Sequence, residues 1–596
     1  MTVRRPELRW RGQGVAEGVA VGRVLRLHDG APNVYRAVLD KAADSAREIR
    51  RLRAAVRLAR RQLLDIKERA SHEFGADHAY IFDAHLLILE DRKLFEEIAD
   101  HIQREQVNAE WAVKVVADRL LAIYAEIKDE YLRARGADIE DVMQRLIAAL
   151  SGKRRHRPQP AEDAVVVAED LLPSAMAELD FKHVRAIATD AGGWTSHTAI
   201  IARGLGIPAV VGLRDLFRRA RTGDCVVVDA SKGTVILHPS PATIAGYRAA
   251  EAKARPIVAP EGGREPLRTA DGVEIILRAN VELPAEYEGV RRYGARGIGL
   301  YRSEFLLSHR GVVPSEDEQC AVYQEIARIA GADGATIRLF DLGGDKLGPF
   351  SDEAERNPAL GLRAIRFSLR REDLLRAQVR AILRAAKNGR LSLVLPMISD
   401  VAEVRRARRI IDEERARLEG AGCEIGPVRV GAMIEVPSAV LTADLLAREV
   451  DFFSLGTNDL VQYLLAVDRS NDEVADWFRS LHPAVLLSID HTVRAARAAG
   501  IPVNVCGEMA ASPAYMVVLI GLGVAEVSMN PSYIPRIRRT VAGIEARRAQ
   551  EIAAECMRCA TADEVEDLVR QRLGGWWPHL FPPELLPAPR EPEAGS

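Results

Sequence analysis

The chain has 596 residues, and at about 150 residues per domain this length predicts roughly four domains. Hydrophobic residues make up 48% of the chain and charged residues 28%, a balance typical of globular proteins rather than disordered ones. The 83 Lys and Arg nearly cancel the 85 Asp and Glu, and the net charge of −2 disfavours a general nucleic-acid binder.

The N-terminal half changes character twice along the chain. Short β-prone runs between glycines over residues 12–27 predict one or two strands. Between Pro32 and Pro158 there is no proline and apolar residues recur at helical spacing, which predicts an all-α insertion. After it, four more runs read as strands: residues 165–170, 186–193, 208–213 and 225–239. A short helix is expected over 196–203, and the whole reads as one α/β domain that the helical segment interrupts.

The C-terminal half predicts a closed barrel. Pro241 to Ala254 reads as a linker helix with Ser240 as its N-cap, and a break rich in Pro and Gly follows at 255–264. Beyond it, eight β-like segments alternate with helical ones, which is the pattern of a (β/α)₈ barrel, with a doubly wound sheet as the alternative. The segments are 272–282, 295–304, 335–345, 391–399, 428–437, 450–459, 501–509 and 524–531. The proline-rich end, 576–596, reads as a loose tail.

The sequence also favours a cytoplasmic protein with no membrane partner. Arginines near the N-terminus are not followed by the apolar stretch of a secretory signal. The longest apolar run, Met516–Ala525, is far shorter than the about 20 residues of a membrane span. Six cysteines in a chain of this length do not make a disulfide framework.

Charged residues gather at the ends of the predicted barrel strands, where barrel enzymes place their sites. The residues at or near these ends are Arg302, Glu304, Arg338, Asp341, Asp345, Lys346, Glu435, Asn458, Asp459, Arg469, Cys506 and Glu508. Glu435 and Asp459 come from neighbouring strands, and two carboxylates suit a hard ion that keeps several waters, hence Mg²⁺. The arginines and the lysine suit a phosphorylated anion.

A second candidate site lies in the N-terminal half. A Gly192-Gly193 turn delivers His197 to the expected N-terminus of the helix at 196–203. Free backbone N–H groups and the helix dipole favour an anion there, so His197 is a candidate phosphoryl acceptor. A structural histidine is the alternative interpretation.

These motifs resemble the enzyme I family of the bacterial phosphoenolpyruvate:sugar phosphotransferase system. The similarity covers about residues 12–575, and its most specific stretches are GGWTSHTAIIARGLGIPAVVG, GIGLYRSEFL, DLGGDK, NPALGLRAIR, VDFFSLGTNDLVQYLLAVDRSN and VNVCGEMA. The resemblance implies a multidomain α/β protein that transfers the phosphoryl group of phosphoenolpyruvate to its own histidine and then to the phosphocarrier protein HPr, releasing pyruvate. It also implies a homodimer formed through the barrel.

The domains implied by the resemblance follow the changes in sequence character. They are a discontinuous phosphohistidine swivelling domain (1–30 and 153–240), a helical HPr-docking domain (31–152), a linker helix and hinge (241–265), a phosphoenolpyruvate-binding (β/α)₈ barrel (266–575) and the tail (576–596). Swinging of the phosphohistidine domain about the hinge is expected, because substrate and HPr belong to different domains.

The resemblance also assigns roles residue by residue. His197 is the phosphorylated histidine and Cys506 the proton donor. Substrate binding is implied for Arg302, Arg338, Lys346, Asn458, Asp459 and Arg469, metal binding for Glu435 and Asp459, and HPr docking for His85. Met176 stands where the family places a threonine that orients the active histidine.

Three other functions are weighed against this one. A pyruvate, phosphate dikinase or phosphoenolpyruvate synthase shares the motifs but needs an ATP-grasp domain, where this chain has only a helical segment. A pyruvate-binding lyase barrel explains Glu435 and Asp459 but leaves His197 without a task. A non-catalytic regulator would not need the full set of candidate residues.

Overall fold

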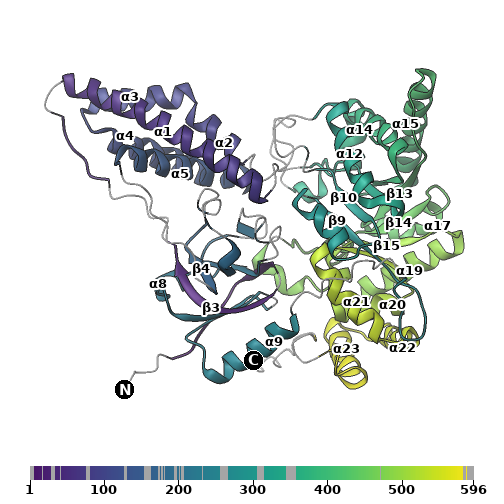
Figure 1. The fold of residues 1–596 in the computed structure, drawn as a ribbon. Coiled ribbons are helices and arrows are strands. Elements are labelled where there is room, and N and C mark those ends of the chain that lie inside the picture. Colours follow the sequence, from purple (N-terminus) through teal and green to yellow (C-terminus); the bar gives the residue numbers. More distant parts are fainter. Residues whose placement is uncertain are drawn as a thin grey trace. The chain divides into compact units, whose positions relative to one another are not determined.

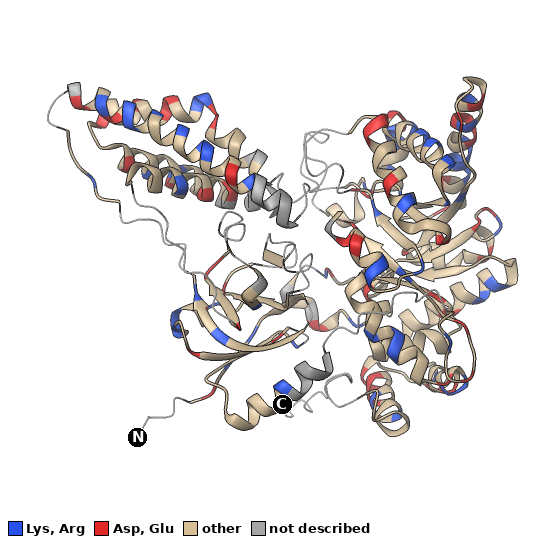
Figure 2. Ribbon diagram, in the orientation of Figure 1, with Lys and Arg blue, Asp and Glu red and all other residues tan. Residues whose placement is uncertain are grey.

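The computed structural model describes residues 6–16, 18–27, 34–39, 42–74, 81–126, 130–152, 163–171, 175, 179, 181–192, 198–199, 202, 207–230, 232–254, 266–282, 284–304, 306, 314–343, 357–469, 471–581 and 586. The chain separates into two compact units, 1–255 and 256–596, each described by itself (Figure 1). Basic and acidic residues are interspersed along many helices of both units (Figure 2). Within the described residues, every helix is too short or too polar to cross a bilayer.

An eight-stranded sheet forms one part of the first unit, in the order β1-β8-β7-β3-β4-β5-β6-β2. The strands are β1 (Leu8–Arg11), β2 (Gln13–Ala16), β3 (Val19–Arg26), β4 (Ala164–Ala168), β5 (Val184–Thr189), β6 (Ala209–Val211), β7 (Cys225–Asp229) and β8 (Thr234–Leu237). Strands β3 to β6 are parallel, and the remaining neighbours pair antiparallel. β4 is buried on both faces, as expected for a continuous apolar run inside a parallel region. The predicted strands of this half are confirmed.

A bundle of helices lies between β3 and β4 in the chain, as predicted. Its helices are α1 (Ala42–Phe74), α2 (Ile81–Leu89), α3 (Arg92–Glu105), α4 (Ala109–Glu126) and α5 (Glu130–Leu150). Leu52, Leu63 and Ile102 are among the residues of its closed apolar core. Asp91 caps α3 by accepting hydrogen bonds from the backbone N–H groups of Lys93 and Leu94, which ends the turn after α2.

The predicted linker helix, α9 (Pro241–Ala254), belongs to the sheet. Ile244 and Tyr247 pack on the apolar face of β3, β7 and β8. The carboxylate of Glu7 accepts hydrogen bonds from the Ser240 backbone N–H (2.9 Å) and the Thr243 hydroxyl (2.8 Å). A helix anchored at its first turn and along one face does not act as a free linker. Residues 255–265, the rest of the predicted hinge, lie outside the described residues.

The second unit is a closed barrel of eight parallel strands, in the order β10-β11-β12-β13-β14-β15-β16-β9. They are β9 (Ile276–Val281), β10 (Ile298–Arg302), β11 (Ala335–Arg338), β12 (Leu391–Leu395), β13 (Val428–Ile434), β14 (Phe452–Leu455), β15 (Val503–Val505) and β16 (Glu526–Met529). Each lies within one of the eight predicted segments, so the barrel prediction is confirmed and the doubly wound sheet is excluded.

Helices cover the outside of the barrel (Figure 1). They are α10 (Tyr287–Arg292), α12 (Glu316–Ala330), α13 (Ile365–Arg370), α14 (Glu372–Ala385), α15 (Val401–Gly420), α16 (Pro437–Leu441), α17 (Ala443–Leu446), α18 (Thr457–Leu465), α19 (Pro483–Ala499), α20 (Pro513–Gly521), α21 (Ile534–Gly543), α22 (Ala546–Cys556) and α23 (Ala562–Trp576). Capping boxes at Ser315 and Asp400 begin α12 and α15. Alternate strand residues such as Phe453 and Leu455 join the outer core beneath these helices.

The prediction of a loose tail from residue 576 is wrong for the part of the tail that is described. Trp577 and Phe581 are only 4% and 1% exposed and join the barrel core, with Leu580 and Leu586 packed against it. Large aromatic side chains bury enough area to anchor a chain end despite neighbouring prolines. Proline content alone was therefore a poor guide to order here.

Candidate active site

Strand alternation sorts the barrel interior into layers. Leu300, Val394, Met433, Phe452 and Cys506 form a small apolar cluster separate from the outer core. Because every second residue of a strand faces the same side, Arg302 and Glu435, two positions beyond Leu300 and Met433, face inward one layer nearer the carboxyl ends. The charged residues predicted from the strand ends therefore form a rim above an apolar floor.

Arg338 is the best-fixed cation of this rim. Glu304 holds it at two points, with Nη2 3.0 Å from Oε2 and Nε 3.1 Å from Oε1, and Asp341 lies 3.3 Å from Nη1. Burial alone lowers the pKa of Arg338, but Glu304 and Asp341 outweigh it and raise that pKa. Glu304 also accepts the Asp341 backbone N–H at 2.7 Å. The guanidinium is therefore charged and held in one orientation before any ligand arrives.

A second rim cation, Arg363, was missed by reading strand ends. It donates to both carboxylate oxygens of Asp341 (2.8 and 2.9 Å), and its Nη1 lies 3.1 Å from Asp459 and 3.0 Å from the Tyr463 hydroxyl. Gly343 makes this approach possible, because a Cβ there would lie 2.5 Å from the Arg363 Cβ. Arg363 does not directly follow a strand. The sequence feature that could have identified it as a site residue is its place in the NPALGLRAIR motif.

Glu435 and Asp459 are the carboxylates predicted to hold a metal. Glu435 is buried and accepts the Met397 backbone N–H at 2.6 Å. A Cβ at Gly456 would lie 2.4 Å from its Oε2, so a larger residue there would displace the Glu435 carboxylate. Burial, reinforced by the charges of Asp459 and Asp341, raises the pKa of Glu435 to about 8. This repulsion is what a hard cation would relieve, so the donor set fits a divalent ion with open positions.

The described residues hold no cluster of three or more Asp, Glu, His or Cys side chains arranged for a metal. A pair of carboxylates completed by water and substrate oxygens is the mode that Mg²⁺ prefers.

Asn458 and Arg302 lie on the same rim, each with a carboxylate partner. The Asn458 amide donates to Glu508 Oε1 (3.0 Å) and accepts the Glu508 backbone N–H (2.9 Å), so its orientation is set by a closed pair of bonds. Arg302 Nη1 lies 3.3 Å from Glu282 Oε2, and its side chain is 38% exposed. A half-buried guanidinium with one carboxylate hydrogen bond can turn toward an anion more easily than Arg338 can.

Cys506 lies at the top of the apolar floor. Its thiol is 4% exposed, accepts a hydrogen bond from the Ser454 hydroxyl at 3.3 Å and lies 3.5 Å from the Leu455 carbonyl oxygen. Burial raises the pKa of Cys506, so the thiol keeps its proton. A protonated thiol beside a cationic rim can act as an acid.

The remaining candidates are placed less closely. Arg469 is exposed in the loop after α18, and its backbone N–H donates to Gln462 at 3.2 Å. His197, Lys346 and Met176 lie outside the described residues. Of the predicted helix at 196–203, the described positions Thr198, Ala199 and Ala202 are helical and buried.

HPr docking by His85 stays a prediction, and the structure shows this side chain buried within the helical bundle. Its side chain is 0% exposed; Nε2 lies 3.2 Å from Asp138 and Nδ1 lies 4.0 Å from Asp141. Phe82 packs edge-on against the ring, with centroids 5.6 Å apart. Through these contacts His85 joins α2 to α5.

Comparisons with known proteins identify the chain's relatives. Three family models match: the N-terminal domain of PEP-utilising enzymes (residues 11–135), their mobile domain (160–233) and their PEP-binding domain (261–546). The second of these spans the segment of His197, and the third spans the barrel rim.

Curated relatives match over nearly the whole chain. The phosphoenolpyruvate-protein phosphotransferase of Geobacillus stearothermophilus is 40% identical over 94% of this chain and 97% of its own length. The protein of that name from Staphylococcus carnosus is 37% identical over 94% and 98%. A solution structure of an Enzyme I protein is 35% identical over 41% of this chain and 98% of its own, with a TM-score of 0.35. This chain is a member of the phosphoenolpyruvate-protein phosphotransferase family of PEP-utilising enzymes.

Proposed function

We propose that this protein transfers the phosphoryl group of phosphoenolpyruvate to its own His197 and then to a histidine of the phosphocarrier protein HPr, releasing pyruvate. The observation that carries the proposal is the rim at the strand ends, where Arg338 and Arg363 stand fixed beside Glu435 and Asp459. Fixed cations beside a carboxylate pair suit a phosphorylated anion bound with a metal. The names of the 37–40% identical relatives support the same reaction.

We assign Glu435 and Asp459 as ligands of a divalent cation, Mg²⁺. When bound, the ion supplies positive charge for the phosphoryl oxygens. Arg302, Arg338, Lys346, Asn458, Asp459 and Arg469 are the proposed substrate-binding residues, and Arg363 is added to them. Arg338 and Arg363 are oriented before substrate arrives, so substrate binding loses little free energy to ordering these side chains.

The proposed chemistry has two parts. A nitrogen of His197 attacks phosphorus in line while the bond to the enol oxygen breaks, and positioning with charge neutralisation supplies most of the catalysis. Cys506 then gives its proton to C3 of the enolpyruvate, which forms the methyl group and the carbonyl of pyruvate. Its high pKa keeps that proton available.

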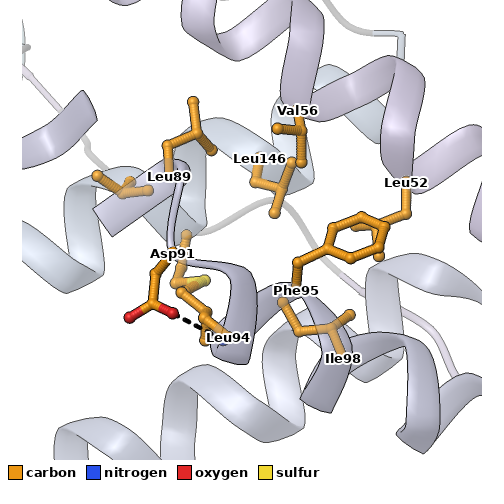
Figure 3. A pocket seen from close by; sticks show the side chains of 10 residues that line it. Leu52, Val56, Leu89, Asp91, Leu94, Phe95, Ile98 and Leu146 are labelled. Carbon is orange, nitrogen blue, oxygen red and sulfur yellow. Dashed lines mark hydrogen bonds between the residues drawn. The ribbon is translucent and has the colours of Figure 1, made fainter. Parts of the chain in front are cut away.

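The helical bundle is the proposed docking unit for HPr. A small apolar pocket opens between α1, α3 and α5 (Figure 3), with half-buried Val56, Leu94 and Phe95 at its edge. Leu87 on α2 is 71% exposed. Exposed apolar side chains and a small apolar pocket on one bundle are both typical of contact surfaces.

We also propose that the barrel forms a homodimer. Leu441, Leu445 and Leu487 are 77%, 45% and 52% exposed, and their helices α16, α17 and α19 pack on one another. Exposed leucines on three packed helices form the kind of apolar patch that a second copy buries.

The first test is to incubate the protein with Mg²⁺ and phosphoenolpyruvate labelled in its phosphate, beside a His197→Ala variant. We expect acid-labile, base-stable label on the wild type alone. Label that survives the His197→Ala substitution would place the acceptor elsewhere. No label on either protein, together with lyase chemistry on pyruvate, would favour the barrel-lyase function instead.

A further inference from the structure

The buried hydroxyl of Ser454, in the barrel interior, has no role in the mechanism proposed above. Ser454 lies on β14 and is 0% exposed. It is paired in register with Met433 of β13 and Asn504 of β15, so it faces the interior with Phe452, two residues before it. Cys506, two residues beyond Asn504, reaches the same layer from the next strand.

Ser454 lies between an apolar cluster and the buried amide of Asn504, its register partner on β15. Leu300, Val394, Met433 and Phe452 form the cluster around Cys506. The Ser454 hydroxyl donates to the Cys506 sulfur at 3.3 Å. Burying a hydroxyl in an apolar layer costs free energy that a hydrogen bond to neutral sulfur recovers poorly. Alanine would avoid that cost, so packing alone does not account for a serine here.

The bond gains strength if the sulfur becomes charged. In the resting thiol, the sulfur lies between the Ser454 donor and the Leu455 carbonyl oxygen, 3.5 Å away. When the S–H proton leaves, the carbonyl becomes a repulsive neighbour and the hydroxyl becomes a charge-assisted donor. Of the charged groups facing this sulfur, Glu435 opposes a thiolate while Arg338 and Arg302 favour one.

We propose that Ser454 is a positioning residue for proton transfer at Cys506, holding the sulfur in place and stabilising the thiolate that remains after the proton has left. The proposal rests on the proposed role of Cys506. In that step the S–H bond breaks and a C3–H bond forms from the enolate π electrons. The thiolate is then reprotonated from water. In reverse, the same thiolate removes a C3 proton from pyruvate.

The test compares Ser454→Ala, Ser454→Thr, Cys506→Ala and the control Ser488→Ala. Ser488 is also a buried serine, but its hydroxyl bonds only the Ala484 carbonyl of its own helix. The first measurement is transfer of label from pyruvate into phosphoenolpyruvate by the phosphorylated protein, which requires removal of the C3 proton. The second is the thiolate absorbance of each protein against pH, minus that of the same protein carrying Cys506→Ala.

We expect Ser454→Ala to slow pyruvate exchange about tenfold and to raise the thiol pKa by about one unit, the size of one hydrogen bond to a charged group. KM for phosphoenolpyruvate should stay unchanged. Ser454→Thr, which keeps the hydroxyl, should recover most of the exchange rate. If Ser454→Ala does not fold, Ser454→Cys keeps the volume with a weaker donor, and it should show the same changes.

Two failures are distinguishable. If Cys506→Ala exchanges label at the wild-type rate, the proposed role of Cys506 is wrong. If Cys506→Ala is impaired while Ser454→Ala matches Ser488→Ala in both measurements, the role of Ser454 is wrong and the proton donor stands.

Discussion

Two charge clusters in this protein, each partly buried, use the same residue types for different purposes. In the helical bundle, Arg51 lies between Glu48 (2.7 Å) and Glu110 (2.6 Å) and also reaches the Leu150 carbonyl at 3.1 Å. Among the described residues, three arginines of the barrel rim face six carboxylates: Arg302, Arg338 and Arg363 against Glu282, Glu304, Asp341, Glu435, Asp459 and Glu508.

The carboxylates respond in opposite ways. Burial raises the pKa of Glu110, but its own backbone N–H, Arg51 and Asn108 outweigh burial and lower it. At Glu435, burial and the neighbouring carboxylates win, and its pKa rises to about 8. In a cluster whose charges cancel, the ion pairs join helices to one another. A cluster with more negative than positive charge instead favours the binding of a cation. Surplus charge of this kind distinguishes a candidate site from a structural ion pair.

We expect the largest loss of activity when one of the surplus carboxylates, Glu435, is removed. We expect Glu435→Ala to slow labelling of His197 by at least about a thousandfold, because it removes a proposed metal ligand. The control is Glu414→Ala, which removes an equally buried carboxylate bonded to Arg376 and Arg380 on the outer helices. That variant should lose stability but keep labelling. Normal labelling by Glu435→Ala would make the rim carboxylates structural, like those of the bundle.

The pH dependence of metal binding should sharpen the contrast. Since Glu435 must lose its proton to bind a cation, we expect Mg²⁺ affinity to rise about fiftyfold from pH 6 to pH 8 and to level off near pH 9, with release of a proton to the buffer. A carboxyl whose folded pKa lies above its unfolded value favours the fold at low pH, so the metal-free protein should lose stability as pH rises from 4.5 to about 8 and no further above it. Calorimetric titration in buffers of different ionisation enthalpy measures the proton, and pH-independent binding would contradict the expectation.

A smaller loss is expected at Arg363. Arg363→Lys keeps the charge but cannot bridge Asp341, Asp459 and Tyr463 together, so we expect kcat/KM for phosphoenolpyruvate to fall about thirtyfold. Steady-state pyruvate release measures it. Arg380→Lys is the matched control, because Arg380 bridges Glu316 and Glu414 on outer helices. Equal losses in both variants would show a general effect on the barrel rather than one on the rim.

The smallest effect on activity is expected in the bundle. Arg51→Met should lower the free energy of unfolding by about 1 kcal/mol, as for a partly exposed ion pair, and leave labelling of His197 by phosphoenolpyruvate unchanged. Denaturant unfolding followed by circular dichroism measures the first quantity. A labelling defect in this variant would mean that the two clusters are not independent.

Much of this protein was determined locally along the chain. Runs of β-branched residues alternate with stretches of helical periodicity, and these patterns do not depend on distant partners. They were enough to predict the eight barrel strands, the helical insertion and the positions of the sheet segments along the chain. The rule that parallel strands bring their carboxyl ends to one edge was enough to name Arg302, Arg338, Glu435, Asp459 and Cys506 in advance.

What the sequence could not supply was decided by packing between segments far apart in the chain. Arg363 meets Asp459 across 96 residues, and Ser454 meets Cys506 across 52. The burial of His85 could not be predicted from the sequence, because it depends on the helices around it. The burial of Trp577 and Phe581 could not be predicted either, because a core can include a proline-rich chain end. Periodicity and propensity act over a few residues, so they determine elements. Burial and the pairing of charges depend on which elements meet, so only the tertiary structure decides which ionisable groups are satisfied and which, like Glu435, remain available for chemistry.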